Sequence, residues 1–390
     1  MTAAADLSIA AVHAAASAAT GGLTDFGPVD YKAPLAALLD PADVDRLDGP
    51  GRALLRHIVT SALVARLWIA LAHAERPGAA AISIERPLFI VGLPRTGSSL
   101  LHQLLALAPD ARAPLLWETM SPGAALVAPD EARAAAAGLC AARPAELHAV
   151  HPLRPDGPAE CYWLLRNSLR SSTFCHQADR PIYRAWLAAS DMEVAYRDHR
   201  RQLQLLLHAR PAARLVLKMP GHVDHLEPLL AVFPGACIVH LHRDPVAALA
   251  SSCNLWRLIA RSNHQPVDPH RIGARLHRRF ARSIERGMAA RRAVDPARVI
   301  DVHHAELARD PAAAVDRIHR HFDLPRPPEL AGRIARAVTG PPPPRHPALA
   351  DYGLDPAAVR RGFAGYCRAF AVAPESNAES AADDAAGEGP

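Results

Sequence analysis

The sequence predicts an α/β protein in which a parallel sheet is covered by helices on both faces. Two observations lead to this fold class. Short apolar runs with β-branched residues alternate along the chain with segments of helical periodicity. In addition, a turn rich in glycine and proline at 92–97 joins the first apolar run, 88–91, to a helix that starts at 98. A strand, a glycine loop and a helix start in this order predict an anion cradle, because free backbone N–H groups converge there.

The remaining elements follow the same alternation. Further buried strands are expected at 215–219, 237–242 and 299–303. Helices are expected at 124–148, 161–169, 184–208, 225–233, after Pro245, and at 272–293, 307–324 and 356–370. Together these elements predict a P-loop-like three-layer fold with a central parallel sheet flanked by helices, plus a helical N-terminal region.

The chain divides into three predicted parts. Residues 1–80 are expected to form a helical extension that serves as a cap or as an arm for a homo-oligomer, since apolar residues recur at helical spacing between 31 and 74. Residues 81–372 hold the α/β domain. Residues 373–390 are acidic and rich in small side chains, which predicts a disordered tail.

Composition limits the kinds of partner. The chain has 390 residues, 50% of them hydrophobic, and a net charge of +5 without a dense run of Lys and Arg. This mild charge suits an anionic ligand better than nucleic acid. The six cysteines form no CxxC pair and are expected to be reduced. No secretory signal is evident at 1–22, and the apolar stretch at 62–74 is short and contains Arg66, so we expect a cytoplasmic protein without a transmembrane segment.

The loop after the first strand departs from the nucleotide-binding pattern. Gly92 and Gly97 have the spacing of G-x-x-x-x-G-K-[ST], but Ser98 stands at the lysine position. A kinase or an ATPase needs that lysine at the β- and γ-phosphates. The pattern therefore indicates an anion site that is not built for a triphosphate, and an ordinary strand–turn–helix connection is the alternative.

Cations follow three of the predicted strands. Arg95 follows the first strand, Lys218 lies at the end of the second and Arg243 at the end of the third. Because ligands of parallel sheets bind at the carboxyl ends of the strands, we expect these three residues to share one crevice. The crevice would suit a multiply anionic ligand, whereas each cation alone would be an ordinary solvated surface charge.

Over residues 86–370 these motifs resemble the sulfotransferases that use 3′-phosphoadenosine-5′-phosphosulfate (PAPS) as donor. The segment PRTGSS at 94–99 is similar to the loop that holds the 5′-phosphosulfate in bacterial and tyrosylprotein sulfotransferases. The segments LKMPGH at 217–222 and HRDP at 242–245, followed by Ser251, resemble the 3′-phosphate site of that family.

The resemblance implies in-line transfer of SO₃ from PAPS to a hydroxyl or amine acceptor, without a metal. It implies that Lys218 stabilises the bridging oxygen as it leaves. The residues implied at the 5′-phosphosulfate are Arg95, Thr96, Gly97, Ser98 and Ser99. Those implied at the 3′-phosphate are Arg243 and Ser251.

The acceptor hydroxyl also needs a base. Glu118 follows Arg95 by 23 residues and resembles the catalytic glutamate of tyrosylprotein sulfotransferases, which makes it the expected base. A helix-capping or structural carboxylate is the alternative for Glu118. His151, in the proline-rich loop at 151–160, is the second candidate base because its pKa suits proton transfer.

Two other functions remain open at this point. One is a kinase-like phosphoryl transferase, which the missing P-loop lysine disfavours. The other is a non-catalytic scaffold that keeps the fold. The acceptor is expected to be a small molecule, glycan, lipid or peptide that bears a hydroxyl, and the segment 340–372 has no assigned role. His240 and His242 share a strand face, but no histidine and carboxylate set has the spacing of a familiar zinc site, so no metal is expected.

Overall fold

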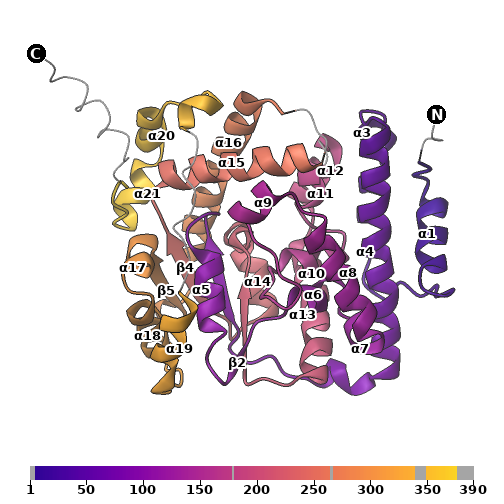
Figure 1. Cartoon of the computed structure of the whole chain (residues 1–390), viewed down its shortest axis with the longest axis horizontal. Helices are drawn as coiled ribbons and strands as arrows, with labels where there is room; N and C mark the ends of the chain where they lie inside the picture. Colours follow the sequence, from indigo (N-terminus) through magenta and orange to yellow (C-terminus); the bar gives the residue numbers. More distant parts are fainter. Residues whose placement is uncertain (1–4, 178–179, 264–266, 339–347, 376–390) are drawn as a thin grey trace, which may run out of the picture.

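The computed structural model describes residues 5–177, 180–263, 267–338 and 348–375, and a five-stranded sheet lies at its centre (Figure 1). In spatial order the strands are β2 (Ala111–Arg112), β3 (Arg214–Lys218), β1 (Leu88–Gly92), β4 (Cys237–His242) and β5 (Val299–His303). All four neighbouring pairs are parallel. The sequence predicts four of these strands. The fifth, β2, is too short to leave a periodic pattern.

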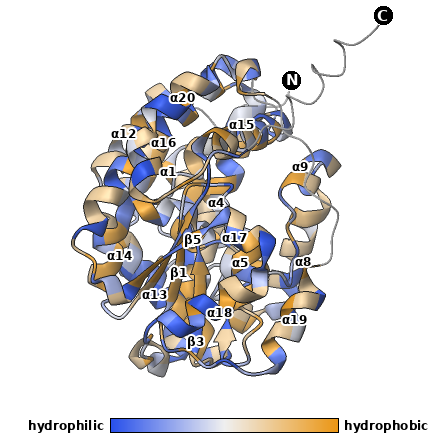
Figure 2. Cartoon of the chain, turned by 90° about the vertical axis from the view of Figure 1, so that its left-hand side faces the viewer, coloured by the Kyte–Doolittle hydropathy of each residue, from blue (hydrophilic) through white to orange (hydrophobic). Residues whose placement is uncertain are grey.

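Helices cover both faces of the sheet, as the three-layer fold requires. Phe89 and Val91 of β1 point to one face, where they pack against α13 (Met192–Ala209) and α14 (Leu226–Val232). Leu88 and Ile90 point to the other face, where they pack against α5 (Ser98–Leu105) and α18 (Pro311–His321). Figure 2 shows the strands as an apolar layer between helices with hydrophilic outer faces. The predicted α/β fold is confirmed.

The other helices and 3-10 turns follow in chain order. Before β1 they are α1 (Ile9–Ala18), α2 (Lys32–Leu38), α3 (Pro41–Val44), α4 (Gly49–Glu75) and η1 (Pro77–Ala81). Between β2 and β3 they are α6 (Leu116–Met120), α7 (Ala124–Val127), α8 (Pro129–Ala141), α9 (Ala145–Val150), α10 (Tyr162–Asn167), α11 (Phe174–Gln177) and α12 (Pro181–Ala189). From β3 to β5 they are η2 (Pro220–His225), α15 (Pro245–Ser262), α16 (Pro269–Arg291) and η3 (Pro296–Arg298). After β5 they are α17 (His304–Arg309), α19 (Glu329–Ala337), η4 (Leu349–Tyr352), α20 (Pro356–Gly362) and α21 (Ala364–Ala369).

Four of the helices predicted as continuous, at 124–148, 184–208, 307–324 and 356–370, are each divided into shorter helices, and the first two show the reason. The segment 124–148 forms α7, α8 and α9, because Pro129 and Pro144 have no N–H group to donate and fit only at a helix start. The segment 184–208 is divided at Asp191, whose side chain accepts from the Glu193 N–H and starts α13. Apolar periodicity runs across both breaks, which is why the sequence pattern does not reveal them.

The N-terminal region contains α4, which is long and apolar enough to cross a membrane by length and composition alone. The apolar stretch at 62–74 is only part of this helix, so the sequence pattern underestimated the length of the apolar segment. Half of its most apolar 18-residue segment is buried inside the protein. The helix packs against α1, α7 and α10. Its buried Arg66 donates to the Asn167 carbonyl and lies 3.5 Å from the Asp198 carboxylate. Core helices of soluble proteins pass the same length test, and these contacts are those of a core helix.

The end of the chain packs beside the sheet. The Tyr366 hydroxyl of α21 and His242 Nδ1 of β4 share a hydrogen bond of 3.0 Å. In addition, α20 packs against α15. Most of the predicted tail, from residue 376, lies outside the described residues. So does the proline run at 341–344, for which a stiff linker is expected. Glu375, the last described residue, contacts Arg243.

His199 of α13 gives a prediction about acid stability. Its ring is fully buried beside Phe89 and Phe233, and within the described residues neither ring nitrogen has a hydrogen-bond partner. Burial lowers the pKa of His199 from 6.5 to about 3. Below pH 6.5 the unfolded chain therefore binds a proton that the folded chain does not, and stability falls as the pH falls. This linkage costs about 2 kcal/mol at pH 5.

We expect His199→Phe to remove this penalty. Urea unfolding should show the variant gaining about 2 kcal/mol more stability over wild type at pH 5 than at pH 7. His208→Gln, at an exposed position of the same helix, is the control and should leave the pH dependence unchanged. Parallel stability curves for wild type and His199→Phe would show that His199 does not carry the effect.

Candidate functional site

The loop after β1 has a backbone that few sequences allow. Gly92 has a φ of 137°, and a Cβ there would lie 2.4 Å from the Leu241 carbonyl oxygen of β4, so only glycine fits. Gly97 has a φ of 86° and is the N-cap of α5. Arg95 lies between them with a φ of 68°, which is uncommon for a side-chain-bearing residue and is typical of functional loops.

The first turn of α5 faces the same loop. The helix begins at Ser98, and within the described residues no side chain caps its N-terminus. Its first N–H groups are therefore available to an anion, and the helix dipole adds positive potential there. The Thr96 hydroxyl is not available in the same way. It is buried and donates to the Leu93 carbonyl at 2.9 Å, so Thr96 closes the loop and can offer a ligand only its backbone.

Lys218 joins the loop to β3. Its buried ammonium group donates to the Ser99 hydroxyl at 3.0 Å and to a Glu160 carboxylate oxygen at 2.5 Å. Lys218 and Ser99, two of the residues predicted for the site, are therefore in contact. Glu160 comes from the loop before α10 and brings a third segment to the same point.

Arg95, Ser251 and Arg243 meet on the other side of the loop. The Arg95 side chain donates through Nε to the fully buried Ser251 hydroxyl at 2.9 Å. The Arg243 guanidinium donates to the Arg95 carbonyl at 2.7 Å. Burial and the nearby Arg243 charge lower the pKa of Arg95. Two cations held this close indicate a site that is completed by an anion.

A carboxylate of this chain meets Arg243. Glu375 accepts from Arg243 Nε at 2.7 Å and from a terminal guanidinium nitrogen at 2.8 Å, a bidentate arrangement that a phosphate could also adopt. Burial would raise the pKa of Glu375, but hydrogen bonds from His304 and Arg243 outweigh it and lower the value to about 2. Glu375 is therefore ionised at neutral pH.

In the structure Glu118 lies in a different set of contacts, and its assignment as the base stays a prediction. Glu118 is 3% exposed, and one of its oxygens accepts from Arg112 at 2.6 Å. Its other oxygen accepts from the Leu115 N–H at 2.8 Å, which caps α6. Glu118 thus has the structural, helix-capping role that the sequence left as its alternative, and it does not line the cavity described next.

A cavity of about 1490 Å³ opens beside the loop. Its described lining includes Arg95, Ser99, Glu160 and Arg243 from the site, together with His151. Much of the remaining wall is apolar and comes from several helices: Leu54, Ile58, Leu139, Leu147, Trp163, Leu187 and Trp256. The cavity therefore offers room for a second, largely apolar molecule beside the cationic group.

Glu160 and His151 both line the cavity, and each could take a proton from a hydroxyl. Burial would raise the pKa of Glu160, but the Lys218 ammonium outweighs it, so the pKa is lowered and Glu160 is ionised. Burial lowers the pKa of His151 to about 4, so His151 is neutral at pH 7. Sequence reasoning missed Glu160, because nothing in the spacing of the loop at 151–160 ties it to β3.

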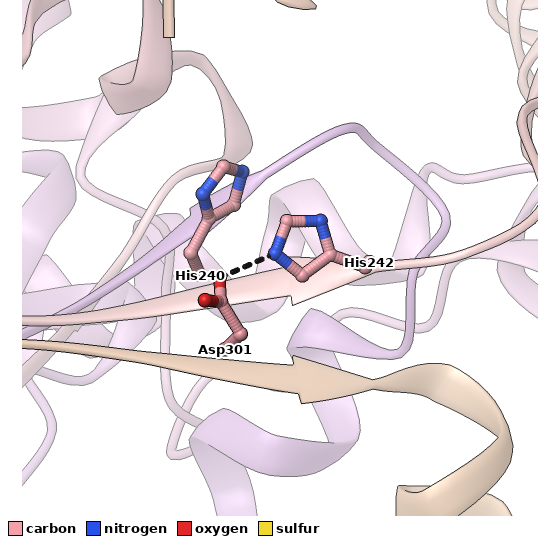
Figure 3. Close-up of side chains that lie close together, drawn as sticks. All are labelled: His240, His242 and Asp301. Atoms are coloured by element: carbon pink, nitrogen blue, oxygen red, sulfur yellow. Dashed lines mark hydrogen bonds and ion pairs between the residues drawn. The ribbon is translucent and has the colours of Figure 1, made fainter. Parts of the chain in front are cut away.

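The described residues contain one cluster with the composition of a metal site, formed by His240, His242 and Asp301 (Figure 3). His242 Nε2 lies 2.6 Å from an Asp301 oxygen. The Arg291 guanidinium pairs with both Asp301 oxygens and contacts His240. A cation already neutralises the carboxylate, so these residues fit an ion-pair network between β4, β5 and α16 better than a metal site.

Comparison with known proteins gives matches over most of the chain. A family model described as "Sulfotransferase family" matches residues 87–328. The omega-hydroxy-beta-dihydromenaquinone-9 sulfotransferases Stf3 of Mycobacterium bovis and Mycobacterium tuberculosis are each 26% identical to this chain over 272 residues, which cover 66% of this chain and 68% of each relative.

Two solved structures are similar over nearly their whole length. Sulfotransferase STF1 from Mycobacterium tuberculosis H37Rv is 31% identical and superposes with a TM-score of 0.79, covering 92% of this chain and 98% of its own. Sulfotransferase STF9 from Mycobacterium avium is 27% identical with a TM-score of 0.82, covering 95% of this chain and 99% of its own.

Proposed function

The chain belongs to the sulfotransferase family, and from this premise we propose that it transfers a sulfuryl group from PAPS to a hydroxyl group of a small, largely apolar acceptor. One observation carries the proposal. Three cations that follow three different strands, Arg95, Lys218 and Arg243, converge around one loop with free N–H groups. A donor with anionic groups at two separated positions matches this arrangement.

The proposed donor contacts follow from the positions of these groups. The 5′-phosphosulfate lies on the loop, held by Arg95, Ser99 and the first N–H groups of α5. The 3′-phosphate takes the place of the Glu375 carboxylate on Arg243. A kinase-like activity is disfavoured, since Ser98 occupies the position of the P-loop lysine.

The proposed transfer is in line. The acceptor oxygen forms a bond to sulfur while the bond from sulfur to the 5′-phosphate oxygen breaks. Lys218 stabilises the charge that develops on the leaving oxygen. Glu160 takes the proton of the acceptor hydroxyl, because it is ionised, lines the cavity and lies beside Lys218.

The acceptor proposal rests on the cavity and on the relatives. Leucine and tryptophan side chains form much of the wall beyond Glu160. The Stf3 relatives are named for a hydroxylated menaquinone. Both support a lipid-like molecule with a hydroxyl as the acceptor of this chain.

Calorimetric titration with adenosine 3′,5′-bisphosphate, the desulfated donor, tests the donor assignment. We expect binding in clear preference to ATP and AMP. Arg243→Ala should lose about ten- to a hundredfold in affinity, since it removes a bidentate contact worth about 1.5–3 kcal/mol. Glu375→Ala removes a competitor and should bind at least as tightly as wild type.

Arg271→Ala is the matched control. Arg271 is exposed on α16 and does not line the cavity, so this variant should bind the bisphosphate like wild type. An Arg243→Ala protein that binds the bisphosphate with wild-type affinity would refute the 3′-phosphate assignment. A preference for ATP would move the protein to the phosphoryl-transfer class.

A further inference from the structure

The wall of the cavity carries far more positive than negative charge. Among the described residues that line it, eleven arginines face two carboxylates, Glu160 and Asp224. The arginines are Arg95, Arg143, Arg166, Arg170, Arg184, Arg243, Arg275, Arg278, Arg279, Arg282 and Arg286. Glu160 is already paired with Lys218. The arginines that line the cavity therefore outnumber its carboxylates, which favours an anionic ligand.

The proposed donor accounts for only part of this charge. Its phosphate and phosphosulfate groups occupy Arg95, Lys218 and Arg243 in the site proposed above, and a phosphate carries a charge of roughly −1.5 to −2. Other lining arginines are held by the protein: Arg143 donates to the His151 carbonyl, and Arg170 pairs with Asp30 at 2.8 Å. Arg166 and Arg275 lie over the rings of Trp163 and Trp256. Arg278, Arg282 and Arg286 of α16 belong to neither set.

Five lining arginines lie on α16, and three of them form a stripe. Arg278, Arg282 and Arg286 recur every four residues, which places them along one face of the helix. Within the described residues these three guanidinium groups have no hydrogen bond or salt bridge. The titratable neighbours that face them are Asp224 and His225 of η2. Like charges at this spacing destabilise a helix, and a bound anion would relieve the repulsion.

Other parts of the wall are apolar. Leu54 and Ile58 come from α4, Leu139 from α8 and Leu147 from α9. A ligand that uses both the apolar wall and the stripe needs a hydrocarbon body and an anionic group. A neutral lipid would leave the stripe without a counter-charge, and a small hydrophilic anion would leave the apolar wall exposed to water.

We propose that the acceptor is an anionic amphiphile whose carboxylate or phosphate binds to the stripe of Arg278, Arg282 and Arg286, while its hydroxyl reaches Glu160 and Lys218. The inference rests on the proposed sulfotransfer to a hydroxyl and adds the charge of the acceptor to it. The arginines then act as specificity-determining residues, because they bind a part of the acceptor that does not react.

Two acceptors that differ only at one end test the proposal. 12-Hydroxydodecanoic acid and 1,12-dodecanediol both offer a terminal hydroxyl, and the acid alone carries an anion. With PAPS as donor, kcat/KM for the acid should exceed that for the diol by about ten- to a hundredfold. Arg278→Gln/Arg282→Gln should abolish this preference, whereas Arg271→Gln, at the exposed control position, should retain it.

Calorimetry provides a readout that does not depend on turnover. The acid should bind to protein saturated with adenosine 3′,5′-bisphosphate, and the double variant should lose this binding while keeping its affinity for the bisphosphate. Equal use of acid and diol, or no binding of the acid, overturns the anionic acceptor and leaves the sulfotransfer proposal intact. Weaker bisphosphate binding by the double variant assigns the stripe to the donor instead. Failure of wild type to bind the bisphosphate would contradict the proposed donor site itself.

Discussion

Replacing Lys218 with alanine is expected to lower kcat by about 10²–10³ while KM for PAPS changes by less than about tenfold. The reason is the position of Lys218 Nζ at the end of β3, where it bonds both Ser99 of the loop and Glu160 of the cavity wall. In the proposed transfer, the ammonium group meets the charge that grows on the leaving oxygen, an interaction stronger in the transition state than in the bound donor. Steady-state kinetics with PAPS and any accepted hydroxyl compound measure both constants.

Loss of folding must be separated from loss of chemistry in this variant. Lys218→Ala leaves the Glu160 carboxylate without its partner, which lowers stability. The double variant Lys218→Ala/Glu160→Gln removes both charges and should recover stability in thermal unfolding, but not activity. A Lys218→Ala enzyme with near-wild-type kcat would show that the leaving oxygen is stabilised elsewhere.

The sheet was predictable because its central strands are almost entirely buried. β1, β3 and β4 are continuous apolar runs bounded by glycine, proline or charge, and such runs are visible in a sequence. β2 was not visible, since two residues carry no period. The helix breaks depended on proline positions within runs of alanine, where periodicity alone gives no boundary.

The cationic part of the site was predictable for a similar reason. Lys218 ends β3, Arg243 directly follows β4 and Arg95 lies in the loop after β1. Parallel topology brings these strand ends together. Glu160 and Glu375 lie on segments whose paths depend on tertiary packing, so no local pattern points to them. Glu118 was also chosen by its position in the sequence. Its distance from Arg95 along the chain matched that of a base, but its side chain turns to Arg112 and caps α6.

A second large effect is expected from replacing Glu160, and Glu118 provides the comparison. Glu160→Gln is expected to lower kcat by about 10²–10⁴, because an amide cannot accept the proton of the acceptor hydroxyl. Glu118→Gln is the matched control with the same chemical change. It weakens the buried pair with Arg112 and should cost about 3–5 kcal/mol of stability, while kcat per folded molecule stays near the wild-type value. Kinetics combined with urea unfolding of both variants separates the two roles.

The pH dependence of wild type tests the same assignment independently. The Lys218 ammonium holds the pKa of Glu160 below its ordinary value of 4.5, and burial holds that of His151 near 4. Neither group gains a proton as the pH falls from about 8 to about 5.5, so kcat/KM should not fall in that window. A loss of activity centred near pH 6.5 would identify an exposed histidine as the base.

If activity survives in Glu160→Gln but is lost in His151→Asn, the neutral imidazole takes the proton. Lys218 and the carboxylate would then form a purely electrostatic pair at the end of β3.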